Sequence, residues 1–187
     1  MLLRRALGVF ALLCACDGQS PVELGRFRVV ATRQTATCGP QSNAYFSRAE
    51  FEVVLQLTGE GGFSWGPVGS SATRGLWSAP SRSFRVIQEE DIVAWAPDRR
   101  REIVGCMLRR SDVIEGTVTL DTNDDAADGG ADGGADAGMP LARSFRATET
   151  IVYGVSAGDC QPILGAAKGQ YSQLPCEVTY TFDARRM

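Results

Sequence analysis

The stretch that decides the fold reads EFEVVLQLTGEGGFSW and covers residues 50–65. From Phe51 to Leu57, apolar side chains alternate with mostly polar neighbours, as a β-strand with one buried face requires. The glycine-rich GEGG at 59–62 then predicts a turn. Phe63 and Trp65 resume the alternation after it, so the stretch predicts a β-hairpin with a loop of about four residues.

The same period of two recurs along the rest of the chain, and no segment has a convincing helical period. The further segments with this period are 27–31, 83–95, 101–110, 113–121, 145–153 and 178–184. The two segments at 101–110 and 113–121 predict either a strand pair or one long bulged strand. The chain is therefore expected to be all-β, as a small antiparallel lipocalin-like barrel or a two-sheet sandwich of about 7–9 strands.

The N-terminus has the pattern of a lipoprotein signal. Two arginines within the first five residues precede a short apolar stretch, which closes with Leu13-Cys14-Ala15-Cys16. A basic start, an apolar segment and a small residue before the cleavage point are the features of a secretory leader. Because Ala15 is small and directly precedes Cys16, we expect cleavage between them and lipidation of the Cys16 thiol. The alternative is an ordinary cleaved leader with an incidental cysteine.

This pattern predicts a signal peptide at 1–15, a lipidated tether at 16–24 and a single β domain at 25–187. Two or three acyl chains on Cys16 would anchor the protein firmly. No later stretch has the roughly 20 apolar residues of a membrane-spanning helix. The expected location is the cell envelope, with the membrane as a partner through the acyl chains, and we favour the outer membrane over the inner one.

Four cysteines remain once the leader is removed and Cys16 is lipidated, namely Cys38, Cys106, Cys160 and Cys176. An even number of thiols outside the cytoplasm predicts disulfides, and four cysteines allow three pairings. We favour Cys160 with Cys176, which would close a short excursion between two strands, and by elimination Cys38 with Cys106. No Cys-x-x-Cys spacing is present, so a metal site is disfavoured.

The segment DTNDDAADGGADGGADAGMP at 121–140 breaks the pattern of strands. It has almost nothing to bury, and such a composition predicts a disordered acidic loop between two strands. Asp121, Asn123 and Asp125 have the spacing that begins a calcium-binding EF-hand loop. The match fails afterwards, because Ala126 stands where glycine is needed and Asp132 where glutamate is needed.

The residue types exclude several functions. The chain has no histidine, which excludes Ser-His-Asp and Cys-His catalysis and histidine-ligated zinc. A net charge of −3, without a long basic run, argues against nucleic acid as a partner. Paired carboxylates for glycoside hydrolysis remain available in Glu89, Glu90, Asp91 and Glu149. Glu149 falls in phase with the apolar residues of its strand, so it would face inward, line a pocket, pair with an arginine or mark a bulge.

Aromatic side chains on the predicted strands are sufficient to line a ligand cavity in a small barrel, and equally sufficient to fill it. The candidate ligand-lining residues are Phe63, Trp65, Trp77, Phe84, Trp95 and Tyr153.

Three segments carry a resemblance to known proteins: 174–182 (LPCEVTYTF), 106–110 (CMLRR) and 37–39 (TCG). With these, the chain resembles a group of uncharacterised single-domain lipoproteins of GC-rich Gram-negative bacteria. That group shares a lipobox, a β-rich domain and cysteines in comparable places, and the resemblance covers roughly residues 25–187. It implies an envelope location and disulfide pairing, and it brings no activity, cofactor or catalytic residue with it.

The sequence thus predicts a lipid-anchored envelope protein without catalytic residues or cofactors, working as a binding module for a small apolar ligand or a protein partner. The alternatives are a structural or accessory envelope protein, with a filled core, and a carboxylate-based hydrolase, with two acidic groups facing each other across a cleft.

Overall fold

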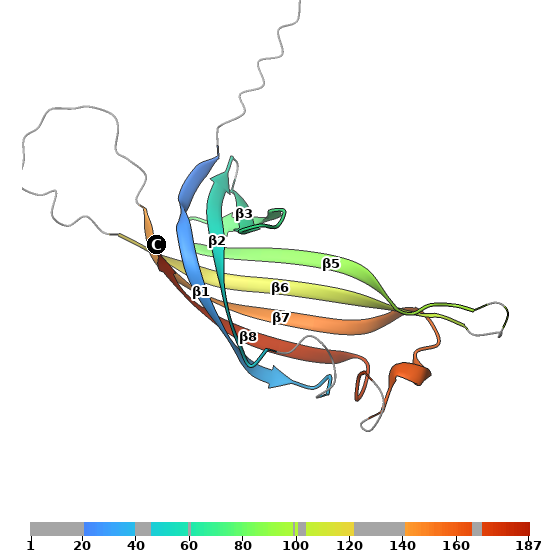
Figure 1. The fold of residues 1–187 in the computed structure, drawn as a ribbon. Helices are drawn as coiled ribbons and strands as arrows, with labels where there is room; N and C mark the ends of the chain where they lie inside the picture. Colours follow the sequence, from blue (N-terminus) through green and yellow to red (C-terminus); the bar gives the residue numbers. More distant parts are fainter. Residues whose placement is uncertain are drawn as a thin grey trace, which may run out of the picture.

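The computed structural model describes residues 21–39, 46–59, 61–98, 100, 104–121, 141–165 and 170–187 (Figure 1). The predicted signal peptide and Cys16 lie outside these residues, and so does the acidic segment apart from Asp121. The strands are β1 (Val22–Ala36), β2 (Arg48–Thr58), β3 (Gly62–Pro67), β4 (Thr73–Ser78), β5 (Ser83–Trp95), β6 (Cys106–Leu120), β7 (Ala142–Gly158) and β8 (Cys176–Arg186). A short 3-10 helix, η2 (Gln161–Ile163), follows β7. Within the described residues, no helix is both long enough and apolar enough to cross a membrane.

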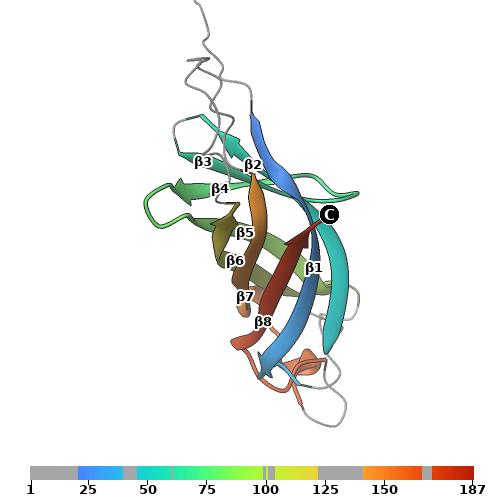
Figure 2. The same ribbon diagram turned by 90° about the vertical axis from the view of Figure 1, so that its left-hand side faces the viewer.

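The eight strands form one closed antiparallel barrel in which each strand pairs with its neighbour in sequence. The barrel closes where β1 pairs with β8, and the register there runs from Phe27 opposite Arg186 to Ala36 opposite Val178. Figure 2 shows β1 and β8 side by side along this seam. The structure confirms the prediction of a small antiparallel barrel, and the sandwich alternative is excluded.

The predicted hairpin is the pairing of β2 with β3, in which Thr58 lies opposite Gly62. The segments at 101–110 and 113–121 contribute to one strand, β6, which pairs along its length with β5 and β7. The sequence reading missed β4. This strand has only six residues and includes Gly75, and each of its faces carries one large apolar residue, Leu76 or Trp77, so no repeated alternation marks the period.

The predicted boundary between tether and domain is wrong by three residues. β1 begins at Val22, and the side chain of Leu24 is only 3 % exposed. Because a buried leucine belongs to the core, the folded domain already includes residues that were assigned to the tether.

Aromatic residues from β1, β3, β5 and β7 meet across the barrel interior near the end where β1 begins. The Phe63 and Phe84 rings stack with centroids 4.6 Å apart, and the Phe27 and Phe145 rings meet edge to face at 5.2 Å. The Trp65 ring centroid lies 6.0 Å from that of Phe84 and 5.8 Å from that of Phe145. Burial of each such side chain stabilises the fold by roughly 1.5–3 kcal/mol, so this cluster is a main source of stability.

The disulfides differ from the favoured pairing. Cys38 bonds to Cys176 and Cys106 bonds to Cys160, so neither Cys160–Cys176 nor Cys38–Cys106 forms. The pairing of Cys160 with Cys176 requires the excursion between β7 and β8 to close on itself. The barrel register decides instead, because it places Cys106 opposite Gly158 and Ala36 opposite Val178. Cys106 therefore meets Cys160, which follows the end of β7, and Cys176 meets Cys38, which follows the end of β1.

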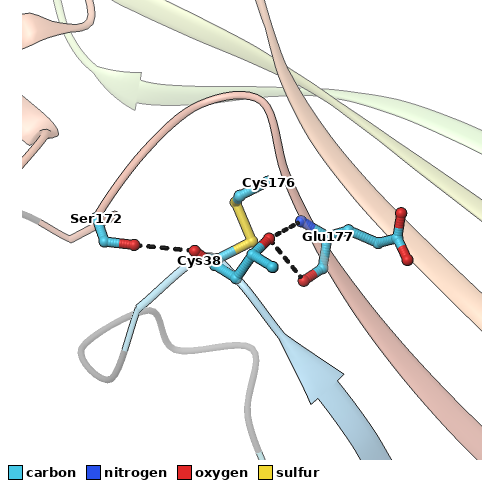
Figure 3. Close-up of a disulfide and its surroundings, with 5 residues drawn as sticks. Cys38, Ser172, Cys176 and Glu177 are labelled. Atoms are coloured by element: carbon cyan, nitrogen blue, oxygen red, sulfur yellow. Dashed lines mark hydrogen bonds between the residues drawn. A yellow bond between two sulfur atoms is a disulfide. The ribbon is translucent and has the colours of Figure 1, made fainter.

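Local hydrogen bonds support the Cys38–Cys176 bond at the end of the seam (Figure 3). The Ser172 hydroxyl donates to the Thr37 carbonyl at 2.9 Å, and the Ser172 amide donates to the Cys38 carbonyl at 2.7 Å. The Glu177 amide donates to Thr37 Oγ1 at 2.9 Å. These bonds hold the connection between β7 and β8 against the end of β1.

Candidate functional site

A pocket of about 380 Å³ opens between the β3–β4 turn and the inner face of the sheet. It exists because β3 and β4 have six residues each, whereas β5, β6 and β7 have 13, 15 and 17. The long strands continue past the turn, so part of their inner face is covered only by the turn. The lining residues are Trp65, Pro67, Ser70, Ser71, Ala72, Thr73, Val86, Gln88, Asp112, Ile114 and Glu149.

The period of two along each strand brings the polar residues of this pocket together. Gln88 lies opposite Asp112 in the β5–β6 register, and Ile114 lies opposite Glu149 in the β6–β7 register. Side chains that are paired across neighbouring strands lie on the same face of a sheet. An amide, two carboxylates and apolar groups therefore converge beneath the β3–β4 turn.

Asp112 is held by Arg110, two residues away on the same strand and hence on the same face. The Arg110 Nε donates to Asp112 Oδ1 at 2.8 Å, and a second guanidinium nitrogen lies 2.7 Å from Oδ2. Burial raises the pKa of Asp112 more than the Arg110 charge lowers it. For Arg110, burial lowers the pKa, but the charge and hydrogen bond of Asp112 outweigh this effect and the pKa is raised. The two contacts from the Arg110 guanidinium fix the Asp112 carboxyl group in one orientation.

Glu149 is the most perturbed acid among the described residues. Burial raises its pKa from 4.5 to about 7, and the nearby Asp112 charge adds to this effect while Arg110 opposes it. β7 has no register irregularity at Glu149, and no ion pair of Glu149 is present among the described residues. Of the roles expected for Glu149, the structure shows the pocket-lining one. A carboxyl group that titrates near neutral pH inside a pocket is a typical mark of a functional site.

The connection between β7 and β8 closes the barrel end beyond this pocket. Ile163 and Tyr171, from that connection, are 5 % and 6 % exposed. The Tyr171 ring lies 5.6 Å from the inward-facing ring of Tyr153. Burial raises the pKa of both tyrosines, so both remain neutral hydrogen-bonding groups. Because Cys160 and Cys176 each bond to a neighbouring strand, this cover is fixed at both ends.

The structure brings together four of the six predicted ligand-lining aromatics, Phe63, Trp65, Trp77 and Phe84, and they contact one another. Of these, only Trp65 also lines the inner pocket. Tyr153 lies at the closed end, against Tyr171. Trp95 is at the end of β5, beyond a register irregularity, and is 40 % exposed.

The other carboxylates considered for hydrolysis do not line the pocket. Asp91 accepts a hydrogen bond from Arg109 Nε at 3.2 Å, and Glu89 and Glu90 are exposed. The sequence reading missed Asp112 and Arg110. The feature that identifies them is the period of two in β6, which puts residues 108, 110, 112 and 114 on one face. The sequence prediction has two segments with a gap at residues 111–112, and this gap interrupts the period.

Among the described residues, no group of three or more cysteines, aspartates or glutamates is placed to hold a metal ion. The arrangement can instead hold a small molecule, with apolar contacts from Trp65, Val86 and Ile114 and polar contacts from Glu149 and Gln88.

Comparisons with known proteins found no matching protein family, no similar curated protein and no similar solved structure.

Proposed function

We propose that this chain is a lipoprotein of the cell envelope, anchored through Cys16, whose barrel is a noncatalytic binding module for a small molecule. The N-terminal sequence and the resemblance to single-domain bacterial lipoproteins support the anchor and an envelope location, and within the envelope we favour the outer membrane. Two disulfides in the barrel support an oxidising compartment.

The observation that carries the binding role is the position of Glu149 in the same pocket as the Trp65 indole. A partly buried carboxylate gains a strong interaction with a cation. The Trp65 indole, whose ring stacks on Phe84 and Phe182, supplies apolar contact. Val86 and Ile114 add apolar surface in the same pocket. The ligand class that fits these groups has a small apolar body and one basic amine, rather than a purely apolar structure.

Protonation of Glu149 would regulate this binding. With the pKa raised to about 7, the carboxyl is mostly ionised at pH 8 and mostly neutral at pH 6. An ammonium group binds the ionised form better, so affinity for an amine rises with pH across this range.

Calorimetric titration of the mature protein with phenethylamine and with phenethyl alcohol at pH 8 tests the proposal. The account predicts that the amine binds and the alcohol binds about tenfold more weakly or worse, since removing a charge-assisted contact costs roughly 1.5–3 kcal/mol. Glu149→Gln should remove this preference. Glu115→Gln, an exposed glutamate on β6, should retain it. Equal binding of amine and alcohol, or an unchanged preference in Glu149→Gln, would contradict the proposal.

The two pocket carboxyl groups favour a second candidate, a carboxylate-based hydrolase, since a neutral Glu149 could act as an acid beside Asp112, which Arg110 holds in place. Hydrolysis of a nitrophenyl glycoside, lost in both Glu149→Gln and Asp112→Asn, would establish that role. The binding module predicts no turnover in any of the three proteins.

A further inference from the structure

A second hollow, of about 590 Å³, lies on the outer face of the barrel at the seam between β1 and β8 and extends onto β7. Three arginines line it, together with one aspartate and one serine: Arg28, Arg146, Arg185, Asp183 and Ser144. It is separate from the inner pocket, because the two sets of lining residues share no member.

Two of these arginines are a like-charge pair within the sheet. Arg28 on β1 lies directly opposite Arg185 on β8. Directly opposed side chains of an antiparallel pair have Cβ atoms about 4.5–5.5 Å apart, and like charges at that separation destabilise the pairing. On its other side Arg28 lies opposite Glu52 on β2, a carboxylate that forms an ion pair with Arg26, so the repulsion between Arg28 and Arg185 is only partly compensated.

The nearest carboxylates are engaged by other arginines. Glu52 accepts a hydrogen bond from Arg26 Nε at 3.0 Å, and Asp183 lies 3.2 Å from Arg146 Nε. Among the described residues, no ion pair is formed by Arg28 or Arg185. Four arginines thus face two carboxylates, and the excess positive charge is centred on the seam.

We propose that this hollow binds a phosphate group, with the Arg28 and Arg185 guanidinium groups as its principal donors and the Ser144 hydroxyl as a third. Planar guanidinium groups match the oxygen edges of a phosphate and bind it through paired hydrogen bonds. An anion placed between the two arginines would also convert their repulsion into attraction. Arg28 and Arg185 would then form an anion-binding site in which the bound anion removes their mutual repulsion.

Two sources could supply the phosphate, a free phosphorylated compound or the headgroup of an anionic lipid. Arg185 is next to the last residue of β8, and Arg28 lies opposite it near the middle of β1, so the pair lies at the end of the β1–β8 seam that is nearer to Val22, the first residue of β1. If Cys16 carries the proposed anchor, this end faces the membrane. The lipid source therefore rests on the proposed function, whereas the phosphate site does not.

The test is calorimetric titration of the mature protein, at low ionic strength, with inorganic phosphate, dihexanoyl phosphatidylglycerol and dihexanoyl phosphatidylcholine. The proposal predicts binding of phosphate or of phosphatidylglycerol with one site per chain. Arg28→Gln and Arg185→Gln should each weaken it about tenfold, since a charge-assisted hydrogen bond contributes roughly 1.5–3 kcal/mol. Arg74→Gln, which removes an equal charge from exposed β4, is the matched control. Tighter binding of inorganic phosphate assigns a free compound, and tighter binding of phosphatidylglycerol assigns the lipid.

Thermal unfolding gives a second readout. The melting temperature without phosphate shows whether each variant folds, and the change on adding phosphate shows whether it binds. Because each glutamine variant removes repulsion at the seam, it should fold and melt at or above the temperature of the unmodified protein without phosphate. Added phosphate should raise the melting temperature of the unmodified protein and of Arg74→Gln, and at the same concentration it should raise that of the two seam variants less. No binding of any of the three probes, or equal weakening in Arg74→Gln, would overturn the proposal. Glu149→Gln should leave phosphate binding unchanged, so this test and the test of the inner pocket can fail separately.

Discussion

Cys38 and Cys176 join the first strand of the barrel covalently to the last, at one end of the seam that closes it. The remaining pairings link strands that are adjacent in sequence, and only the β1–β8 pairing must bring together segments 138 residues apart. A bond at this position limits the separation of the two strands in the unfolded chain, where the entropic cost of barrel closure is largest.

Replacing both Cys38 and Cys176 with alanine should therefore lower the free energy of unfolding substantially. On the chain-entropy relation, the crosslink contributes about 5 kcal/mol, and the Cys106–Cys160 crosslink, with a separation of 54 residues, about 4 kcal/mol. Urea unfolding of the two double-alanine variants measures both effects. A seam variant as stable as the unmodified protein would show that the closure does not depend on this bond.

Peptide mapping without reduction should recover the peptide with Cys38 linked to the one with Cys176, and the peptide with Cys106 linked to the one with Cys160. This expectation follows from the register, since Cys106 lies opposite Gly158, close to Cys160, whereas Cys176 lies opposite Tyr153, seven residues before Cys160. A Cys160–Cys176 peptide would restore the pairing favoured from the sequence and would contradict the register at the barrel end.

Much of the fold was predictable from the sequence because burial on one face imposes a period of two, and the segments around Val53, Phe84, Phe145 and Phe182 have it. The disulfide pairing was not predictable from the sequence, because it depends on which strands lie next to one another. Those neighbours are known only once the barrel is closed. The pocket was only partly predictable. Glu149 was noticed from its phase, whereas Asp112 became visible only when β6 proved to be one strand.

Glu149 should make stability depend on pH. In the folded protein its pKa is about 7 instead of 4.5, so the folded state holds this proton where the unfolded chain has released it. The free energy of unfolding therefore falls as pH rises from about 4.5 to about 7. Above that range Glu149 is ionised in both states, and this contribution to stability falls no further. Glu149→Gln should be more stable than the unmodified protein by about 2 kcal/mol at pH 8, allowing for solvent screening, and equally stable at pH 4.

Urea unfolding at pH 4, 6 and 8 measures this difference, with Glu115→Gln as the exposed control. Asp112, Arg110 and Tyr180 also surround Glu149 from β6 and β8, but they are common to both proteins and cancel in the comparison. A constant difference at all three pH values would show that Glu149 does not titrate between them.

Gly116 makes room for the aromatic core. A Cβ atom at this position would lie 2.5 Å from Phe84 Cζ and 2.8 Å from Ala147 Cβ, too close for either to remain in place. Gly116→Ala should therefore lower the free energy of unfolding by about 1–3 kcal/mol. Gly154→Ala on β7, where a Cβ meets nothing within 4 Å, should cost nothing and is the matched control. Equal stability of the two variants in urea would show that the Phe84 ring can move away freely.

The central claim is that this barrel works while tethered to a membrane in an oxidising compartment. The most direct test is the intact mass of the protein extracted from the membranes of the cells that make it, measured without reduction. The account predicts a chain that begins at Cys16, carries acyl groups on that residue and lacks the four hydrogens lost in two disulfides. An unprocessed chain that begins at Met1, with all its thiols reduced, would contradict it.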